Sequence, residues 1–349
     1  MSSTQVIKIL TADQVDASAI SYLPSYPRGG AHLNITNTCD RPWNTVIIHP
    51  DGECYTCICG AWLPISVGNI QSFDKIEDIW NNPTANFLQQ DLIDKKFTYC
   101  AVNHCGITDH NIIDQPQKYT INLSVDESCN LACPSCRRTA INITSGPLFD
   151  TKSIMISHLL ELIQNCKNPM ELIMISSGDP LASLIMRPLI LNWQPTINQT
   201  ITLFTNGLLM KKLLPSSSIL SNITKFWISV DAGSKEVYEN VRRPGKFEIL
   251  RENLDWLSKN KPKFSTVTLK FTLSAGNASD IINFCDMVSH YNFLGDISNV
   301  DDLRTWDDFS SHEVISNTAH PYHSTAITQL RNVSTRPYIG LSSFFNKVL

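Results

Sequence analysis

The sequence predicts an α/β protein in which a partial (β/α)6 barrel follows a small, cysteine-rich α+β domain. Two observations lead to this prediction. Strand-like and helix-like runs alternate from Tyr119 to about residue 300, and nine of the eleven cysteines lie between Cys39 and Cys136. Strands that alternate with helices predict β-α-β units and a mainly parallel sheet. Six such units fit a partial barrel better than a complete barrel of eight.

Length and composition exclude several classes of protein. At 349 residues the chain is long enough for two domains, and its net charge of −4 provides no global basic field for nucleic acid. No apolar run is long enough to span a bilayer, and the first ten residues lack the apolar core of a signal peptide. The cysteines therefore predict metal or cluster ligation in a reducing compartment. We expect a cytoplasmic protein with no membrane and no nucleic-acid partner.

Composition divides the chain into four segments. In order, they are an N-terminal arm at 1–30, the cysteine-rich domain at 31–115, the barrel at 116–300 and a C-terminal tail at 301–349. The tail is long enough to cover the barrel or the substrate site. Its histidines, His312, His320 and His323, lie in polar surroundings where most histidines are solvated. The sequence assigns the arm no role.

The cysteine-rich domain begins with a hairpin signal. The apolar run Thr45–His49 leads into Asp51-Gly52, and the predicted return strand carries Cys54, Cys57 and Cys59. A helix is predicted next, over Ile76–Gln90, and a loop with Cys100 and Cys105 follows. Such an arrangement can bring two distant cysteine pairs around one cluster. A structural zinc site is the alternative, because the spacing alone is compatible with both.

The barrel is predicted from its alternating runs. The predicted strands are Tyr119–Val125, Glu171–Ser176, Thr200–Thr205, Lys225–Val230, Thr266–Thr272 and Gly295–Val300. The predicted helices are Thr151–Lys167, Leu181–Trp193, Leu208–Leu214, Lys235–Asn260 with a break at Pro244-Gly245, and Ala278–Tyr291; Ala326–Val333 is a further short helix in the tail. Ligands in such folds bind at the C-terminal ends of the strands, so we expect the site residues there.

Three thiols follow the first barrel strand. Cys129, Cys133 and Cys136 are spaced C-x3-C-x2-C on a short loop. Cysteine thiolates are the usual protein ligands of a 4Fe–4S cluster, and three of them leave one iron open. This spacing predicts chemistry at the open iron as well as electron storage. Zinc is the alternative, but it prefers four closed ligands and the loop offers three.

This loop resembles the cluster loop of the radical S-adenosylmethionine (SAM) superfamily, with Ser135 where the family commonly has an aromatic residue. The resemblance implies a TIM-like radical SAM barrel, with Cys129, Cys133 and Cys136 as catalytic cluster ligands. Later strand ends resemble the superfamily's SAM pocket, with Asp179 replacing the usual Glu and Ser177 a Gly. By this resemblance the SAM-binding residues are Ser177, Gly178, Asp179, Pro180, Thr205, Asn206, Ser229, Asp231 and Lys270.

The cysteine-rich domain resembles the twitch domain, the shorter relative of the SPASM domain, which holds one auxiliary 4Fe–4S cluster. By this resemblance the auxiliary ligands are Cys39, Cys57, Cys100 and Cys105. Cys54 and Cys59 are surplus, and Cys59 is the first substitute because it shares a strand face with Cys57. In the family this module usually follows the barrel, whereas here it precedes it, so the order is permuted.

The resemblance implies reductive cleavage of SAM to a 5′-deoxyadenosyl radical, which abstracts a hydrogen from the substrate. With an auxiliary cluster taking up an electron, we expect an oxidoreductase that modifies a peptide or small metabolite. A flavodoxin- or ferredoxin-type reductant is expected to supply electrons to the enzyme. One alternative is a redox-neutral epimerase or isomerase, which needs a thiol such as Cys166 or Cys285. The other is a non-catalytic iron–sulfur or zinc scaffold. SAM turnover distinguishes an enzyme from a scaffold.

Overall fold

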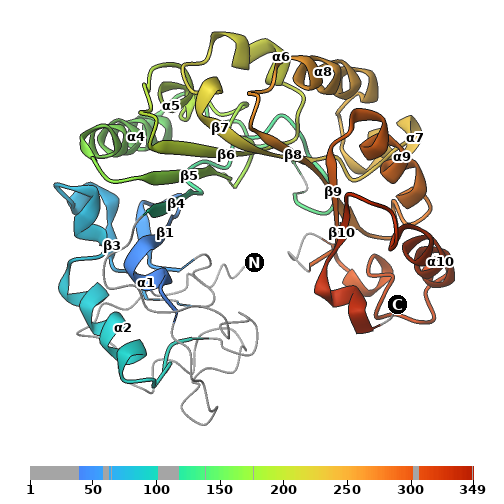
Figure 1. Cartoon of the computed structure of the whole chain (residues 1–349), viewed down its shortest axis with the longest axis horizontal. Coiled ribbons are helices and arrows are strands. Elements are labelled where there is room, and N and C mark those ends of the chain that lie inside the picture. The colour runs from blue at the N-terminus through green and yellow to red at the C-terminus, as the bar shows by residue number, and fades with distance from the viewer. Residues whose placement is uncertain are drawn as a thin grey trace. The chain divides into compact units, whose positions relative to one another are not determined.

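The computed structural model describes residues 39–57, 63, 65–100, 118–137, 139–175, 177–301, 306–347 and 349 (Figure 1). These residues form two compact units. Unit 1 contains the described residues up to Val125, with Ser145–Met174 and Pro195–Thr200; unit 2 contains Asp126–Thr144, Ile175–Gln194 and Ile201–Leu349. The division follows spatial contacts, and the domain boundaries given above stay predictions. No helix in the described ranges is long and apolar enough to span a bilayer.

Unit 1 is built on five strands in the order β5-β4-β1-β2-β3. Their bounds are β1 Thr45–Ile48, β2 Glu53–Tyr55, β3 Gly68–Asn69, β4 Tyr119–Leu123 and β5 Met170–Met174. Strand β4 pairs in parallel with both β1 and β5, whereas β1 and β2, and β2 and β3, pair antiparallel. The hairpin that the sequence predicts is therefore confirmed, and it extends a parallel pair.

The hairpin turn depends on Gly52. Its φ of +87° lies in the left-handed region, and its N–H donates to the His49 carbonyl at 2.9 Å. Strand β2 ends at Tyr55, so Cys57 follows the return strand instead of lying in it. The predicted position of Cys59 lies outside the described residues.

The helix predicted over Ile76–Gln90 is two segments. They are the 3-10 turn η4 Ile76–Ile79 and helix α2 Pro83–Ile93, and unit 1 also contains α1 Arg41–Asn44, η3 Ile70–Ser72 and α4 Pro147–Asn165. Asn82 causes the restart, since its side chain accepts a hydrogen bond from the Ala85 N–H at 3.0 Å. Pro83 then takes the first helical position, where a missing N–H costs nothing.

Helix α4 is fixed in unit 1 by a buried lysine. Lys152 is 4% exposed, and its ammonium donates to the carbonyls of Pro50 and Val125, both at 2.8 Å. These carbonyls follow β1 and β4, so the lysine joins the helix to the C-terminal ends of two adjacent strands. The apolar face of α4, including Leu159 and Leu162, is buried.

Unit 2 is built on the parallel strands β6 to β10. The bounds are β6 Gln199–Thr205, β7 Ile223–Ser229, β8 Thr266–Leu273, β9 Leu294–Asn299 and β10 Ile339–Leu341. The helices are α5 Arg187–Leu191, α6 Met210–Leu213, α7 Lys235–Val241, α8 Phe247–Asn260, α9 Ile281–Tyr291 and α10 His323–Val333, with 3-10 turns η6 Leu214–Ser216, η7 Leu220–Asn222, η8 Phe309–Ser311 and η9 Ser343–Lys347. The alternating strands and helices predicted for the barrel are confirmed.

The two faces of the unit 2 sheet differ. One face is apolar and covered by helices α8 and α9 (Figure 1), with the Phe271 ring of β8 lying 5.0 Å from that of Phe284 on α9. On the opposite face, Trp227 of β7 contacts the ring of Phe204 edge to face at 5.7 Å. Lys270 of β8 is on this second face and keeps its ammonium 5.5 Å from the centre of the Trp227 ring. Polar ligands are therefore expected on this face.

Candidate functional site

A cavity of about 380 Å³ lies in unit 2, where strands β6 and β7 end. It brings together the three loop cysteines and most of the residues predicted to contact SAM. Those in its lining are Cys129, Cys133, Cys136, Ser177, Gly178, Asp179, Thr205, Asn206 and Ser229. Of the other residues predicted to bind SAM, Pro180, Asp231 and Lys270 are described but do not line it. The sequence also missed five lining residues: Leu131, Arg137, Ile175, Phe204 and Arg242.

Main-chain hydrogen bonds hold the cysteine loop in place. The Cys129 N–H donates to the Ile141 carbonyl at 2.8 Å, and the Ala132 N–H donates to the Arg243 carbonyl at 2.7 Å. Cys133 is buried, Cys129 is half-buried and Cys136 is exposed. Burial raises the pKa of the Cys129 thiol to about 11. Such a thiol is neutral without a ligand, and bound metal is what would deprotonate it.

Arg137 joins the cysteine loop to the turn after β5. One terminal nitrogen donates to the Glu127 carbonyl at 2.6 Å, and the other donates to the Ser177 carbonyl at 2.5 Å. The two carbonyls belong to segments fifty residues apart in the sequence. Arg137 therefore sets the distance between the predicted cluster ligands and the predicted SAM turn.

Gly178 makes the closest approach between these segments. The next residue, Asp179, donates its N–H to the Ser128 carbonyl at 2.8 Å. A Cβ atom on Gly178 would lie 2.1 Å from that same carbonyl oxygen, well inside contact distance. Only glycine therefore allows the turn to lie against the cysteine loop.

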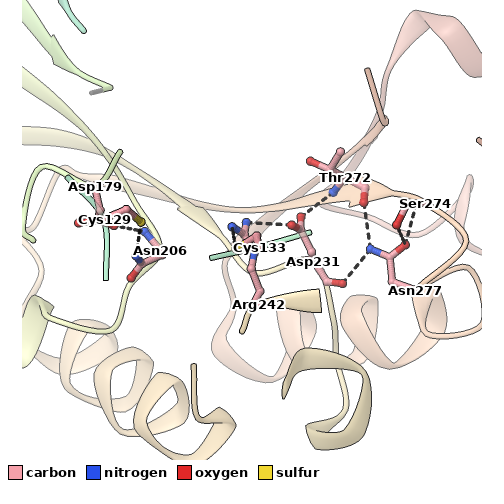
Figure 2. Close-up of polar contacts among 9 residues, drawn as sticks. All are labelled: Cys129, Cys133, Asp179, Asn206, Asp231, Arg242, Thr272, Ser274 and Asn277. Atoms are coloured by element: carbon pink, nitrogen blue, oxygen red, sulfur yellow. Dashed lines mark hydrogen bonds and ion pairs between the residues drawn. The ribbon is translucent and has the colours of Figure 1, made fainter. Parts of the chain in front are cut away.

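The carboxylate of Asp179 holds the turn after β5 against the end of β6 (Figure 2). One oxygen accepts hydrogen bonds from the Thr205 hydroxyl at 2.9 Å and the Asn206 N–H at 2.6 Å. The other accepts from the Leu181 N–H at 2.9 Å. The side chain is 2% exposed; burial raises the pKa of its carboxyl, and these donors oppose the rise. Both oxygens thus have partners within the protein, and contact with a SAM ammonium stays a prediction.

We expect Asp179→Asn to lower the free energy of unfolding by about 2 kcal/mol, because the amide NH2 would face at least one of the N–H or O–H donors. Urea titration of the apoprotein measures this. Asp286→Asn is the matched control, since Asp286 pairs with Arg336 at the surface with 62% of its side chain exposed. It should change stability by less than about 0.5 kcal/mol. Equal losses in the two variants would contradict the bracing role of Asp179.

Asn206 connects β6 to the cysteine loop. Its amide nitrogen donates to the Asn130 side-chain oxygen at 2.8 Å and lies 3.8 Å from the Cys129 sulfur (Figure 2). Its own side-chain oxygen accepts from the Leu208 N–H at 3.1 Å. Asn206 is 5% exposed, so these contacts fix its orientation. The residue therefore positions the loop that carries Cys129.

Asp231 stands just beyond β7, outside the cavity lining. Its φ of +59° is left-handed, and its side chain accepts a hydrogen bond from the Thr272 N–H at 2.7 Å. Its carbonyl accepts from the Asn277 side chain at 2.9 Å (Figure 2). Lys270 pairs in register with Ser229 and forms an ion pair with Asp296 on β9. Roles of Asp231 and Lys270 toward SAM stay predictions.

The predicted auxiliary ligands lie in unit 1. Cys39 and Cys100 pack with Leu92 and Phe97 in one buried cluster. Burial, with a smaller contribution from the nearby Cys57, raises the pKa of Cys39 to about 12. Three of the four predicted ligands therefore share one region, and the fourth, Cys105, lies outside the described residues.

Cys54, which the sequence leaves surplus, has different surroundings. It is fully buried on β2, and its thiol donates to the Gly52 carbonyl at 3.6 Å. Burial raises the pKa of this thiol. These contacts are those of a core side chain.

Family comparison identifies the cysteine-rich part of the chain. Residues 39–106 match the SPASM iron–sulfur cluster-binding domain. The prediction of a SPASM-like domain placed N-terminally is thereby confirmed. The match includes all four cysteines predicted as auxiliary ligands, although it assigns no role to any of them. No curated protein matches the chain.

Solved structures resemble this chain only in part. SuiB from Streptococcus suis, bound to precursor peptide SuiA, has 13% identity, with 78% of this chain and 58% of SuiB covered at a TM-score of 0.41. TYW1 with a lysine-pyruvate adduct bound has 16% identity, with 60% and 72% covered at 0.40. HydG, a maturase of the [FeFe]-hydrogenase, has 12% identity, with 64% and 51% covered at 0.32. The chain thus spans less than two thirds of SuiB or HydG, and no residue role is carried over from them.

Proposed function

We propose that this protein is a radical SAM enzyme whose unit 2 cavity holds a 4Fe–4S cluster on Cys129, Cys133 and Cys136, with SAM beside it. One observation carries the proposal. The cavity joins three closely spaced thiols to Gly178, Thr205 and other residues from successive strand ends. The cluster and SAM would supply one-electron cleavage of SAM and hydrogen abstraction, and an auxiliary cluster would supply an electron acceptor.

The residues of the cavity suit these groups. Three cysteines of one loop are among the lining residues, and their number suits a cluster with one open iron. The absence of a side chain at Gly178 lets this turn lie against the cysteine loop, so both segments reach the cavity wall together. Leu131, Ile175 and Phe204 supply apolar lining, which limits the water around a bound ligand.

The other residues keep this geometry rigid. Asp179 and Asn206 use their side chains on neighbouring protein groups, so they hold the strand ends at fixed distances from the cysteine loop. Ser229 brings a hydroxyl-bearing side chain to the lining, whereas the Thr205 hydroxyl already donates to Asp179 at 2.9 Å. Hydroxyls suit the carboxylate or ribose of SAM, because they can donate to one and donate or accept with the other.

For unit 1, the proposal assigns Cys39, Cys57, Cys100 and Cys105 as ligands of the auxiliary cluster. An auxiliary cluster that can accept an electron favours net oxidation of a peptide or small metabolite. A flavodoxin- or ferredoxin-type protein is the expected reductant, and the cytoplasm the expected compartment. The redox-neutral alternative has less support, because its candidate thiols, Cys166 and Cys285, are buried and neither lines the cavity. The Cys166 thiol instead donates to Glu77 at 3.6 Å.

The test is iron and sulfide content of anaerobically reconstituted protein, with EPR spectra before and after SAM and an assay for 5′-deoxyadenosine under reduction. We expect about eight irons per chain, from two 4Fe–4S clusters. We also expect an EPR signal that changes with SAM, and 5′-deoxyadenosine as product. Zinc in place of iron, or iron without any response to SAM, would refute the proposal and favour a scaffold.

A further inference from the structure

Arg242 lies between the cysteine loop and Asp231 (Figure 2). It ends helix α7, and one terminal nitrogen of its guanidinium forms an ion pair with the Asp231 carboxylate at 2.9 Å. The other terminal nitrogen lies 3.6 Å from the Cys133 sulfur, in hydrogen-bonding geometry. The Arg242 side chain is only 13% exposed and that of Asp231 8%. A charge this deeply enclosed has a strong effect on its neighbours, because little water screens it.

The surrounding residues fix this arginine. Asp231 is held by the Thr272 N–H at 2.7 Å and, through its carbonyl, by Asn277 at 2.9 Å. The Arg243 carbonyl accepts from the Ala132 N–H, so the chain after α7 lies against the cysteine loop itself. The ion pair with the Asp231 carboxylate at 2.9 Å offsets the cost of burying the Arg242 guanidinium, a group that stays protonated in proteins. The arginine is therefore charged and immobile.

Two buried donors near Cys133 lack acceptors among the described residues. They are the Nε–H of Arg242 and the hydroxyl of Tyr238, which is fully buried. Tyr238 lies one turn before Arg242 on α7, and its carbonyl accepts a hydrogen bond from the Arg242 N–H at 2.8 Å. Buried donors are almost always paired in native proteins, so this side of the loop suits a group rich in acceptors. The thiolates and sulfides of an iron–sulfur cluster are such acceptors.

We propose that Arg242 is a positioning residue that holds Cys133 as a cluster ligand and raises the reduction potential of the cluster. The Asp231 carboxylate partly offsets the effect of the Arg242 charge on that potential. This rests on the proposed function. Hydrogen bonds to the sulfurs and local charge are among the factors that set cluster potentials. Reduction adds negative charge, so a fixed cation and an N–H donor at one thiolate stabilise the reduced form more than the oxidised form.

The experiment is an EPR-monitored redox titration of the reconstituted full chain, following the signal that changes with SAM. We expect Arg242→Met to lower the ratio of reduced to oxidised cluster at a fixed potential about tenfold, which is 59 mV for a one-electron couple. Asp231→Asn should raise that ratio severalfold, because it leaves the arginine charge uncompensated. Asparagine also tolerates the left-handed backbone of Asp231, so this variant keeps the local fold.

Arg251→Met is the matched control. Arg251 is a partly buried arginine of α8 in the same unit, bound to the Tyr291 hydroxyl at 2.9 Å and outside the cavity lining. It should leave the potential unchanged. General structural damage would not shift the reduction potential in opposite directions in Arg242→Met and Asp231→Asn.

The outcomes separate this inference from the function on which it rests. An unchanged potential in Arg242→Met, or shifts of the same sign in both variants, would overturn the role of Arg242 while the cluster itself remains. Should Arg242→Met fail to take up iron, the sign of the Asp231→Asn shift decides the question alone. A wild-type chain with no cluster on Cys129, Cys133 and Cys136 would instead overturn the proposed function.

Discussion

Cys133→Ala should abolish the formation of 5′-deoxyadenosine and remove about four irons per chain, leaving the auxiliary cluster in place. Cys133 is 5% exposed and is the central thiol of the loop, so its loss leaves two ligands that cannot hold a cubane. The loop should keep its path, because the bonds that fix it are main-chain ones, such as that from Ala132 to Arg243. Product analysis under reducing, anaerobic conditions and an iron assay measure both effects.

Cys285→Ala is the control for this prediction. Cys285 is a fully buried thiol of α9 in the same unit, and it does not line the cavity. This variant should keep both the product and about eight irons, with a stability loss of about 1 kcal/mol for the deleted sulfur. Product that survives in Cys133→Ala would remove this cysteine from the ligand set. Loss of all iron in that variant would show that the two clusters do not load independently.

The strands could be predicted because each is a short apolar run bounded by turn residues. Strands β4 to β9 all fall within three residues of the predicted limits. The helices were harder to predict. Residues 181–193 have an apolar pattern, yet only Arg187–Leu191 is helical, since Asp179 draws the Leu181 N–H into a turn and Pro188 provides no N–H. Strand β10 has three residues with Gly340 in the middle, too short for any periodic signal.

The candidate site, like the fold, combines residues that the sequence suggests with contacts that it does not reveal. Its cysteines and strand-end residues were proposed because they resemble the motifs of a known superfamily, and one cavity brings most of them together. The contacts that support them could not, because they join residues far apart in sequence. Arg242 and Cys133 are separated by 109 positions, and Asp179 and Asn206 by 27. A lone arginine after a helix, or an aspartate already expected to bind a ligand, has no pattern that reveals such a partner.

Gly178→Ala should destabilise unit 2 by about 3 kcal/mol and remove the response of the EPR signal to SAM. The new methyl group would lie 2.1 Å from the Ser128 oxygen and 2.6 Å from that of Glu127, both backbone atoms that cannot rotate away. To relieve the contact, the turn must withdraw from the cysteine loop and lose the Asp179–Ser128 hydrogen bond. Thermal unfolding of the apoprotein measures the first effect, and EPR with SAM measures the second.

Gly340→Ala is the same chemical change where space permits it. Its Cβ would meet its nearest neighbour, the Gly295 oxygen, at 3.6 Å, an ordinary contact on β10 of the same unit. This variant should unfold within about 0.5 kcal/mol of the wild type and keep the SAM response. If the two alanine variants behaved alike, the close approach at Gly178 would not be what holds the turn. A Gly178→Ala protein that is stable but unresponsive to SAM would show that the approach serves the ligand more than the fold.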